Sequence, residues 1–405
     1  MSMVAVGSTA CSDASSADSH DPPAALEREA NLAVTPPAES APSGDLARSA
    51  VARFEPVCET TPRSDAFWST VGDYSLVWNG EGHGIAWADY GSAEKRLFFA
   101  RLDANGKQIG SATTVATNFS YGNKLVFNGT EYGLAFATYR SGGRVLEFVR
   151  FDASGKLLGE PLHVTLGEVY GDLDLVYADG QYAVVWRENR RPGAAIALLR
   201  IDANGQKIGN EIVLRHRSEF AHDPTIVATN DAYGVAWADA RHGNGDEVYF
   251  TRVSKGGAIL GTEQRITDNE GQSELPVIAW SGSQYGLFYS QRLDPTSMEE
   301  RFVALDSNGQ RVGSERLVAG NVRSYGRVKR AIWTGTEYSV AFGQTDGVGI
   351  HRIAPDGTAT APRKLLGPGL DPTFAWSGSS YRAIWRVPAS KEQFFDLRIS
   401  PDLCP

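Results

Sequence analysis

The chain has 405 residues, a formal net charge of −9, 43 glycines, 15 tyrosines and 9 tryptophans. This composition predicts short β-strands joined by tight turns. The acidic balance and the absence of a Lys/Arg-rich run argue against sequence-independent nucleic-acid binding and give no reason to expect binding to an anionic membrane surface. No segment of the sequence reaches the roughly 20 apolar residues that span a bilayer.

Residues 1–11 are small and uncharged and end in Ser8-Thr9-Ala10-Cys11. Small residues before a cysteine resemble the end of a bacterial lipoprotein signal, in which the cysteine is lipidated. The segment lacks a basic start and a full apolar core of about 7–15 residues, so a start further upstream and an ordinary N-terminal segment remain alternatives. The resemblance implies lipidation at Cys11 and an exported protein of the outer membrane, periplasm or cell surface.

Residues 12–50 are rich in Ser, Ala and Pro and contain almost no aromatic residues. Seven acidic and two basic residues give this segment a net charge of −5. Such a composition buries too little apolar surface to offset chain ordering, so we expect a disordered tether, followed by one folded domain over 51–405.

The folded part contains seven pairs of apolar landmarks, nine residues apart, each spanning a turn signal. The pairs are Trp78 and Trp87, Phe127 and Phe136, Tyr177 and Trp186, Ala228 and Trp237, Trp280 and Tyr289, Trp333 and Phe342, and Trp376 and Trp385. In six of them a tyrosine follows the first landmark by five residues, and in the first pair this residue is His83. A turn flanked by period-two alternation predicts a β-hairpin.

A second signature follows six of the seven hairpins, as in Arg101-Leu102-Asp103-Ala104-Asn105-Gly106. Close copies cover 150–155, 200–205 and 304–309, and looser copies cover 252–257 and 352–357. Asn-Gly in three of these predicts a tight turn in which both residues have positive φ, leading into a fourth strand. Each unit is therefore predicted to contain four antiparallel strands.

Successive first landmarks are separated by 43 to 53 residues. Four-stranded units of this length in a run of seven predict an all-β, seven-bladed β-propeller. A β-solenoid or two stacked sandwiches are the alternative architectures.

The seventh unit has room for only three strands before Pro405. We expect the segment 54–58 to supply its fourth strand and so close the ring. Cys58 on this strand and Cys404 beyond the third strand would then lie within disulfide range; two unrelated thiols are the alternative. A disulfide would close a very long loop and indicates an oxidising compartment.

The connections from second to third and from fourth to first strands are expected to be long and to share one face, where function usually lies. Arginines recur near the ends of the second strands and on one long loop: Arg140, Arg187, Arg190, Arg241, Arg292 and Arg386, with Arg323 and Arg327. Their guanidinium groups could bind the carboxylates of an acidic glycan. Alternatively, each arginine pairs with a local acid such as Glu188, Asp239, Asp246 or Glu392.

Signals for catalysis, metals and cofactors are weak. The sequence has no G-x-S-x-G or H-E-x-x-H motif, and His216 and His222 are expected to be solvated loop residues. Asp239, Asn244 and Asp246 offer oxygen atoms but do not match a calcium loop. We therefore predict neither a metal nor a cofactor. The D-x-x-G turns resemble sialidase Asp boxes without their paired Ser and Trp, and a glycosidase would need two carboxylates about 5–9 Å apart.

The W-x-G…Y-G-x-x-W and R-x-D-x-x-G patterns resemble those of secreted or surface propeller lipoproteins of bacteria with large genomes. This resemblance implies the fold and leaves the activity open. We expect a non-enzymatic binding or scaffolding module that recognises an acidic glycan or a surface protein and reaches the membrane only through its lipid. The alternative is a carbohydrate-active hydrolase or lyase that uses carboxylates on the long-loop face.

Overall fold

The computed structural model describes residues 71–90, 94–165, 167–189, 193–218, 220–243, 245–294, 297–322, 330–388 and 395–399. All of them belong to one compact unit, Ser49–Pro405. The predicted lipidation site Cys11, the tether 12–50, the segment 54–58 and both cysteines of the predicted disulfide, Cys58 and Cys404, lie outside the described residues. Within the described ranges, no helix has the length and apolarity needed to cross a membrane.

Four sheets contain four strands each, in chain order. The first is β1 (Val71–Trp78), β2 (His83–Asp89), β3 (Arg96–Leu102) and β4 (Gln108–Ala116). The second is β5 (Phe119–Phe127), β6 (Glu131–Arg140), β7 (Gly143–Asp152) and β8 (Leu157–His163). The third is β9 (Val169–Ala178), β10 (Gln181–Asn189), β11 (Ala194–Asp202) and β12 (Lys207–Ser218). The fourth is β13 (His222–Ala228), β14 (Ala232–Asp239), β15 (Glu247–Ser254) and β16 (Ile259–Arg265).

The next strands form an eight-stranded sheet, because one pair, Val322 with Gln344, joins two four-stranded groups. These groups are β17 (Gln272–Trp280), β18 (Tyr285–Asp294), β19 (Ser297–Leu305) and β20 (Arg311–Val322), then β21 (Ala331–Trp333), β22 (Tyr338–Gln344), β23 (Gly347–Ile353) and β24 (Lys364–Gly367). The last sheet comprises β25 (Leu370–Trp376), β26 (Tyr381–Pro388) and β27 (Phe395–Ile399) in the described part. The predicted four-stranded antiparallel arrangement is confirmed for the first six units, and the predicted fourth strand of the last unit lies outside the described residues.

Each landmark packs on the residue five positions later, directly across its hairpin. Trp78 pairs with His83 and Trp280 with Tyr285. The two rings of the second pair have their centres 4.6 Å apart. Aromatic cross-strand pairs stabilise sheets, which explains why a tyrosine recurs at this spacing.

The turn between third and fourth strands differs from the prediction in one respect. In the first copy, only Gly106 has a positive φ, 82°, and Asn105 does not. The Asp103 carboxylate Oδ1 instead accepts hydrogen bonds from the backbone N–H of Asn105 and Lys107, both at 2.9 Å. The aspartate therefore shapes the turn, and the prediction of a two-residue Asn-Gly turn was wrong.

The prediction that all second-to-third connections are long was also wrong. In the second unit Arg140 pairs directly with Gly143, and in the sixth Gln344 pairs with Gly347. Gly143 and Gly347 adopt φ values of 124° and 131°, a conformation that glycine allows without a steric penalty. Long loops are therefore present on some units only.

In every unit except the last, a small residue on the second strand lies at the contact with the next sheet. A Cβ atom added to Gly133 would lie 2.5 Å from Cε1 of Tyr182, and one added to Gly234 would lie 2.6 Å from Cε1 of Tyr285. Each of these tyrosines belongs to the next sheet along the chain and is fully buried. Glycine at this position therefore makes room for the aromatic ring of the following unit.

Arginines add a second set of contacts between units. Arg150 Nη1 donates to the carbonyl of Ala203 at 2.6 Å, and Arg200 Nη1 donates to the carbonyl of Lys255 at 2.8 Å. Both carbonyls lie in the third-to-fourth turn of the next unit. Arg382, on β26 of the last sheet, bonds in the same way to the Ala104 and Asn105 carbonyls of the first unit. The last unit thus contacts the first.

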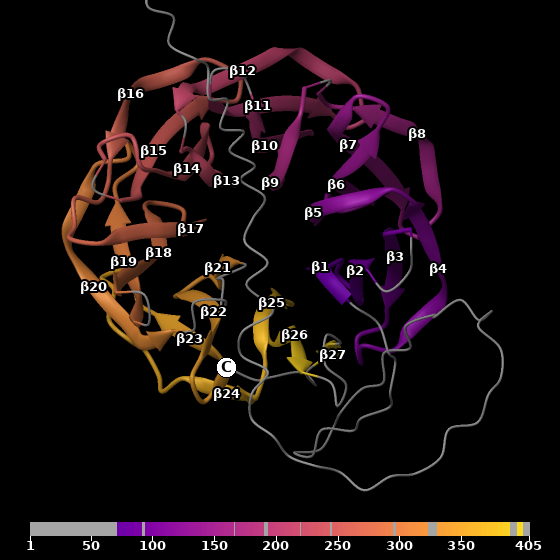
Figure 1. Cartoon of the computed structure of the whole chain (residues 1–405). Helices are drawn as coiled ribbons and strands as arrows, with labels where there is room; N and C mark the ends of the chain where they lie inside the picture. The colour runs from indigo at the N-terminus through magenta and orange to yellow at the C-terminus, as the bar shows by residue number, and fades with distance from the viewer. Residues whose placement is uncertain are drawn as a thin grey trace, which may run out of the picture. The chain divides into compact units, whose positions relative to one another are not determined.

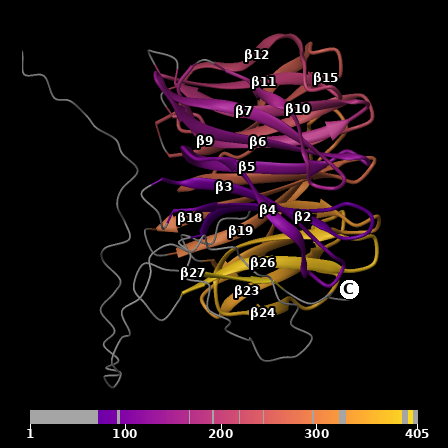
Figure 2. The ribbon, with the colours of Figure 1, turned by 90° about the vertical axis from the view of Figure 1, so that its right-hand side faces the viewer.

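The first strands lie nearest the centre of Figure 1 and the fourth strands lie at the periphery. Strand β1 contacts β5 on one side and β25 on the other. In the side view the strands of successive sheets run across the picture in similar directions (Figure 2). The sheets therefore pack face to face, and their buried clusters contain residues of two successive units.

Candidate functional site

The first strands of the units enclose a central cavity of about 510 Å³. Residues of β1, β5, β9, β13, β17, β21 and β25 line it, as their inner position in Figure 1 suggests. This volume is within the roughly 300–1,000 Å³ typical of small-molecule sites. The cavity and its mouth are the candidate site.

Carboxylates recur at one end of the cavity because the first strands bulge there. The strand pairing shifts register at this point in β1, β13, β17 and β25. Asp73, Asp223 and Asp371 adopt positive φ values of 40°, 49° and 49° there. Positive φ in residues other than glycine stores strain and concentrates at functional sites. These aspartates were not among the residues predicted for the site, although their spacing is regular: each lies five residues before the first landmark of its unit, as Asp172 also does.

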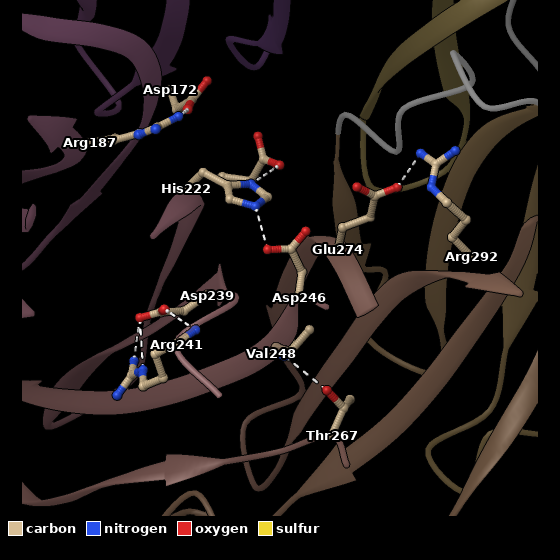
Figure 3. A network of polar contacts seen from close by, with 11 residues as sticks. Asp172, Arg187, His222, Asp239, Arg241, Asp246, Val248, Thr267, Glu274 and Arg292 are labelled. Carbon is tan, nitrogen blue, oxygen red and sulfur yellow. Dashed lines mark hydrogen bonds and ion pairs between the residues drawn. The ribbon is translucent and has the colours of Figure 1, made fainter. Parts of the chain in front are cut away.

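Three of the predicted arginines pair with carboxylates of these first strands. Arg292 Nη2 lies 2.6 Å from Glu274 Oε1 (Figure 3). Arg187 Nη1 lies 3.5 Å from Asp172 Oδ2 (Figure 3), and Arg386 forms an ion pair with Asp371. We call these three pairs, together with Asp73 and the His222–Asp223 pair, the rim. These three arginines therefore pair with acids of their own unit, which was the alternative to ligand binding. Their partners are not Glu188, Asp239, Asp246 or Glu392, the acids that the sequence suggested.

His222 is the fourth cation of the rim. The prediction that it lies on a solvated loop was wrong. It begins β13, and its ring bonds through Nδ1 to Asp223 Oδ2 at 2.8 Å and through Nε2 to Asp246 Oδ1 at 3.0 Å (Figure 3). Burial alone would lower the pKa of His222, but the hydrogen bonds to the two carboxylates raise it well above its usual value. The imidazole is therefore held as a cation at neutral pH.

The other two described arginines point toward the outer strands. Arg140 Nη2 lies 2.6 Å from Glu147 on β7. Arg241 lies 2.7 Å from Asp239 (Figure 3) and also pairs with Glu263 on β16, and its guanidinium carbon lies 3.7 Å from the ring centre of Tyr249. These arginines, with Asp239, therefore lie apart from the rim.

The remaining candidates fall outside the described part of the chain. Arg190, Arg323, Arg327, Asn244 and Glu392 have no described position, and the side chain of His216 is not described. Asp239 and Asp246, considered as calcium ligands, bind different cations. Among the described residues, no group of three or more His, Cys, Asp or Glu side chains is placed to hold a metal ion.

Deeper in the cavity, one residue of each first strand occupies the position three before the landmark. We call this set the interior layer: Ser75, Lys124, Asp174, Thr225, Val277, Arg330 and Thr373. Lys124 Nζ lies 3.6 Å from Asp174 Oδ1. Arg330 Nη1 donates to the carbonyl of Leu76 at 2.9 Å. Burial lowers the pKa of Arg330, and Asp174 opposes this effect.

Comparison with known proteins gives the fold and little more. No family model and no curated protein matches the chain. The β-propeller domain of the trilobed protease from Pyrococcus furiosus is similar at TM-score 0.50 and 11% identity, over 82% of this chain and 96% of that one. A protein of unknown function from Dyadobacter fermentans has TM-score 0.48, 12% identity and coverage of 70% and 95%. A subtype N10 neuraminidase-like protein of A/little yellow-shouldered bat/Guatemala has TM-score 0.46, 9% identity and coverage of 84% and 94%. The four-stranded sheets and the first of these similarities identify the fold as a β-propeller.

Proposed function

We propose that this chain is a non-enzymatic binding or scaffolding propeller with seven blades. Contacts of β1 with both β5 and β25, and the hydrogen bonds from Arg382 to the first unit, support a closed ring. The last sheet has three strands in the described part. The segment 54–58 is proposed to complete it as a fourth strand.

The rim is proposed to recognise a glycan. Asp73, Asp172 and Asp223 of the rim line the cavity, and its other residues lie on the strands around it or next to them. Its ion pairs keep partly exposed side chains, such as Asp172 at 25% and Arg187 at 23%. A sugar hydroxyl both donates and accepts, so a carboxylate beside a guanidinium offers it two oriented partners. Because the arginines are already paired, the rim favours hydroxyl-rich ligands over densely charged polyanions. The ion-paired rim around the cavity is the observation that carries this proposal.

A glycan array, combined with an activity screen on the same polysaccharides, tests the proposal. We expect binding without product release. Arg187→Gln should weaken binding about tenfold or more, as expected from the loss of a charged hydrogen bond. Arg140→Gln is the matched control, because Arg140 also ends a second strand but pairs with Glu147 away from the rim. Product release would instead support the hydrolase or lyase alternative, and failure to bind any glycan would favour a protein partner.

Export, lipidation and the disulfide are further parts of the proposal. We propose that Cys11 carries the lipid and that Cys58 and Cys404 form a disulfide in the exported protein. Metabolic labelling with a fatty acid should mark the wild-type protein and not Cys11→Ser. Non-reducing mass spectrometry should recover a peptide pair joined through Cys58 and Cys404, and two free thiols would contradict the disulfide.

A further inference from the structure

The interior layer has an excess of positive charge. Lys124 and Arg330 are its two cations, and Asp174 is its one carboxylate, which leaves a net charge of +1 in this layer. The rim carboxylates Asp73, Asp172 and Asp223 line the same cavity outside the layer. The carboxylate is already well satisfied: Asp174 Oδ2 accepts from Thr225 Oγ1 and from the Ile226 backbone N–H, both at 3.0 Å. The uncompensated charge therefore resides with the cations.

Arg330 reaches across the cavity instead of to a neighbouring sheet. It lies next to β21, whereas its hydrogen-bond acceptor Leu76 lies on β1, and β25 lies between these two strands in the ring (Figure 1). This crossing places the guanidinium inside the cavity. A guanidinium has five N–H donors, and among the described residues Arg330 makes one hydrogen bond, the one to Leu76. Donors therefore remain for a ligand.

The rest of the lining suits a hydroxylated molecule. Each first strand pairs with a neighbouring strand on one side only, so its other edge is open toward the cavity. Some backbone groups of these strands are already bonded, as the Leu76 carbonyl is to Arg330 and the Ile226 N–H is to Asp174; groups of the open edge that carry no such bond can bind a ligand. Consecutive residues line the cavity, such as Asp73–Leu76 on β1 and Gly171–Val176 on β9. Successive side chains of a strand point to opposite faces, so a run of consecutive lining residues indicates that the backbone edge of the strand faces the cavity. Hydroxyl groups of a sugar can use such an edge.

We infer that the interior layer binds the carboxylate of a sugar acid, held by Arg330 and Lys124, with the sugar hydroxyls on the strand edges. The two cations of this layer can hold a monoanion, whereas a phosphate dianion would meet stronger repulsion from Asp174 and from the rim carboxylates of the same cavity. The cavity of about 510 Å³ accommodates one or two sugar residues, so the acid is a terminal one. This inference rests on the proposed glycan recognition and names the ligand class.

Isothermal titration calorimetry on the full chain tests it with D-glucuronate, D-galacturonate and N-acetylneuraminate, against the neutral analogues D-glucose and D-glucuronamide. We expect at least one acid to bind and its neutral counterpart to bind at least tenfold more weakly. Arg330→Gln should lower the affinity for the acid about 10- to 100-fold. Lys124→Met should lower it several-fold. Arg363→Gln is the control, because Arg363 pairs with Asp346 outside the cavity lining.

One variant should act in the opposite direction. Asp174→Asn removes the competing carboxylate and is expected to raise the affinity for the acid several-fold, which a merely unfolded variant could not do. Thermal unfolding of every variant checks that it folds. The inference is overturned if no acid is preferred over its neutral analogue, or if the preference survives Arg330→Gln. If only neutral glycans bind, the sugar-acid inference is wrong and the proposed glycan recognition is supported. If no glycan binds, the sugar-acid inference and the proposed glycan recognition are both wrong.

Discussion

Glu300 provides a direct test of how a buried charge affects stability. It lies on β19, is fully buried, and accepts one hydrogen bond, from Ser290 Oγ at 2.9 Å. Its second oxygen, Oε1, has no partner among the described residues. Other third-strand glutamates have cations, as Glu147 has Arg140 and Glu247 has Arg265. Burial raises the pKa of Glu300 from 4.5 to about 8, and the hydrogen bond from Ser290 opposes this effect.

The sign of the effect follows from proton linkage. Below about pH 4.5 both the folded and the unfolded chain hold this proton, so the group has no pH-dependent effect. Between 4.5 and 8 only the folded chain holds it. The free energy of unfolding therefore falls by about 1.4 kcal/mol per pH unit. From pH 5 to pH 8 the loss is about 3–4 kcal/mol.

Glu300→Gln keeps the shape and removes this titration. We expect the stability of the variant relative to wild type to increase by about 3–4 kcal/mol between pH 5 and pH 8. Urea unfolding followed by tryptophan fluorescence at several pH values measures it. Glu160→Gln, which removes an exposed carboxylate on β8, is the control. If Glu300→Gln and wild type lose stability in parallel over this range, the reasoning is refuted.

Three further predictions concern the rim and the contacts between units. His222→Asn should cost more stability at pH 6 than at pH 9, because the raised pKa makes the imidazolium contribution complete below about pH 6.5 and lost at high pH; equal losses in urea unfolding would contradict this. Gly234→Val should destabilise by about 2–3 kcal/mol through overpacking against Tyr285, whereas Gly142→Ala, where the added atom meets open space, should have little effect on the melting temperature. Arg382→Met should cost about 2 kcal/mol, because two turn carbonyls lose their donor, and an unchanged urea midpoint would count against this contact.

The regular features of the fold were predictable because they depend on local spacing. A landmark, a turn and a tyrosine five residues later form one hairpin, and every contact within it is close in sequence. The contacts of Asp103 are also close in sequence, although its role as the hydrogen-bond acceptor of its turn was not predicted. Among the described residues, the predicted arginines also lie at or near the ends of second strands, as Arg140 and Arg292 do. Local sequence was enough for all of these features.

The candidate site was harder to predict because its contacts join distant segments. Arg187 could be placed at a strand end, but its pairing with Asp172 depends on a bulge that shifts the register of the first strand. Arg330 and Leu76 are separated by 254 residues, and no local pattern connects them. Counting back from each landmark would have found the interior layer, because its seven residues share one offset.

The junction between the last and first units has a consequence for how the proposed ring would assemble. Elsewhere a small residue, Gly, Ala or Ser, follows the second-strand tyrosine, but the last unit has Arg382 there, and the first unit has His83 in place of the tyrosine. The units are therefore not interchangeable. In a rearranged order, Arg382 would meet a tyrosine ring and His83 would leave a gap beside a glycine. We expect shuffled or circularly repeated versions of this chain to assemble poorly. The contact between the last and first units differs from the other contacts in side-chain size and charge, and it therefore fixes the order of the units.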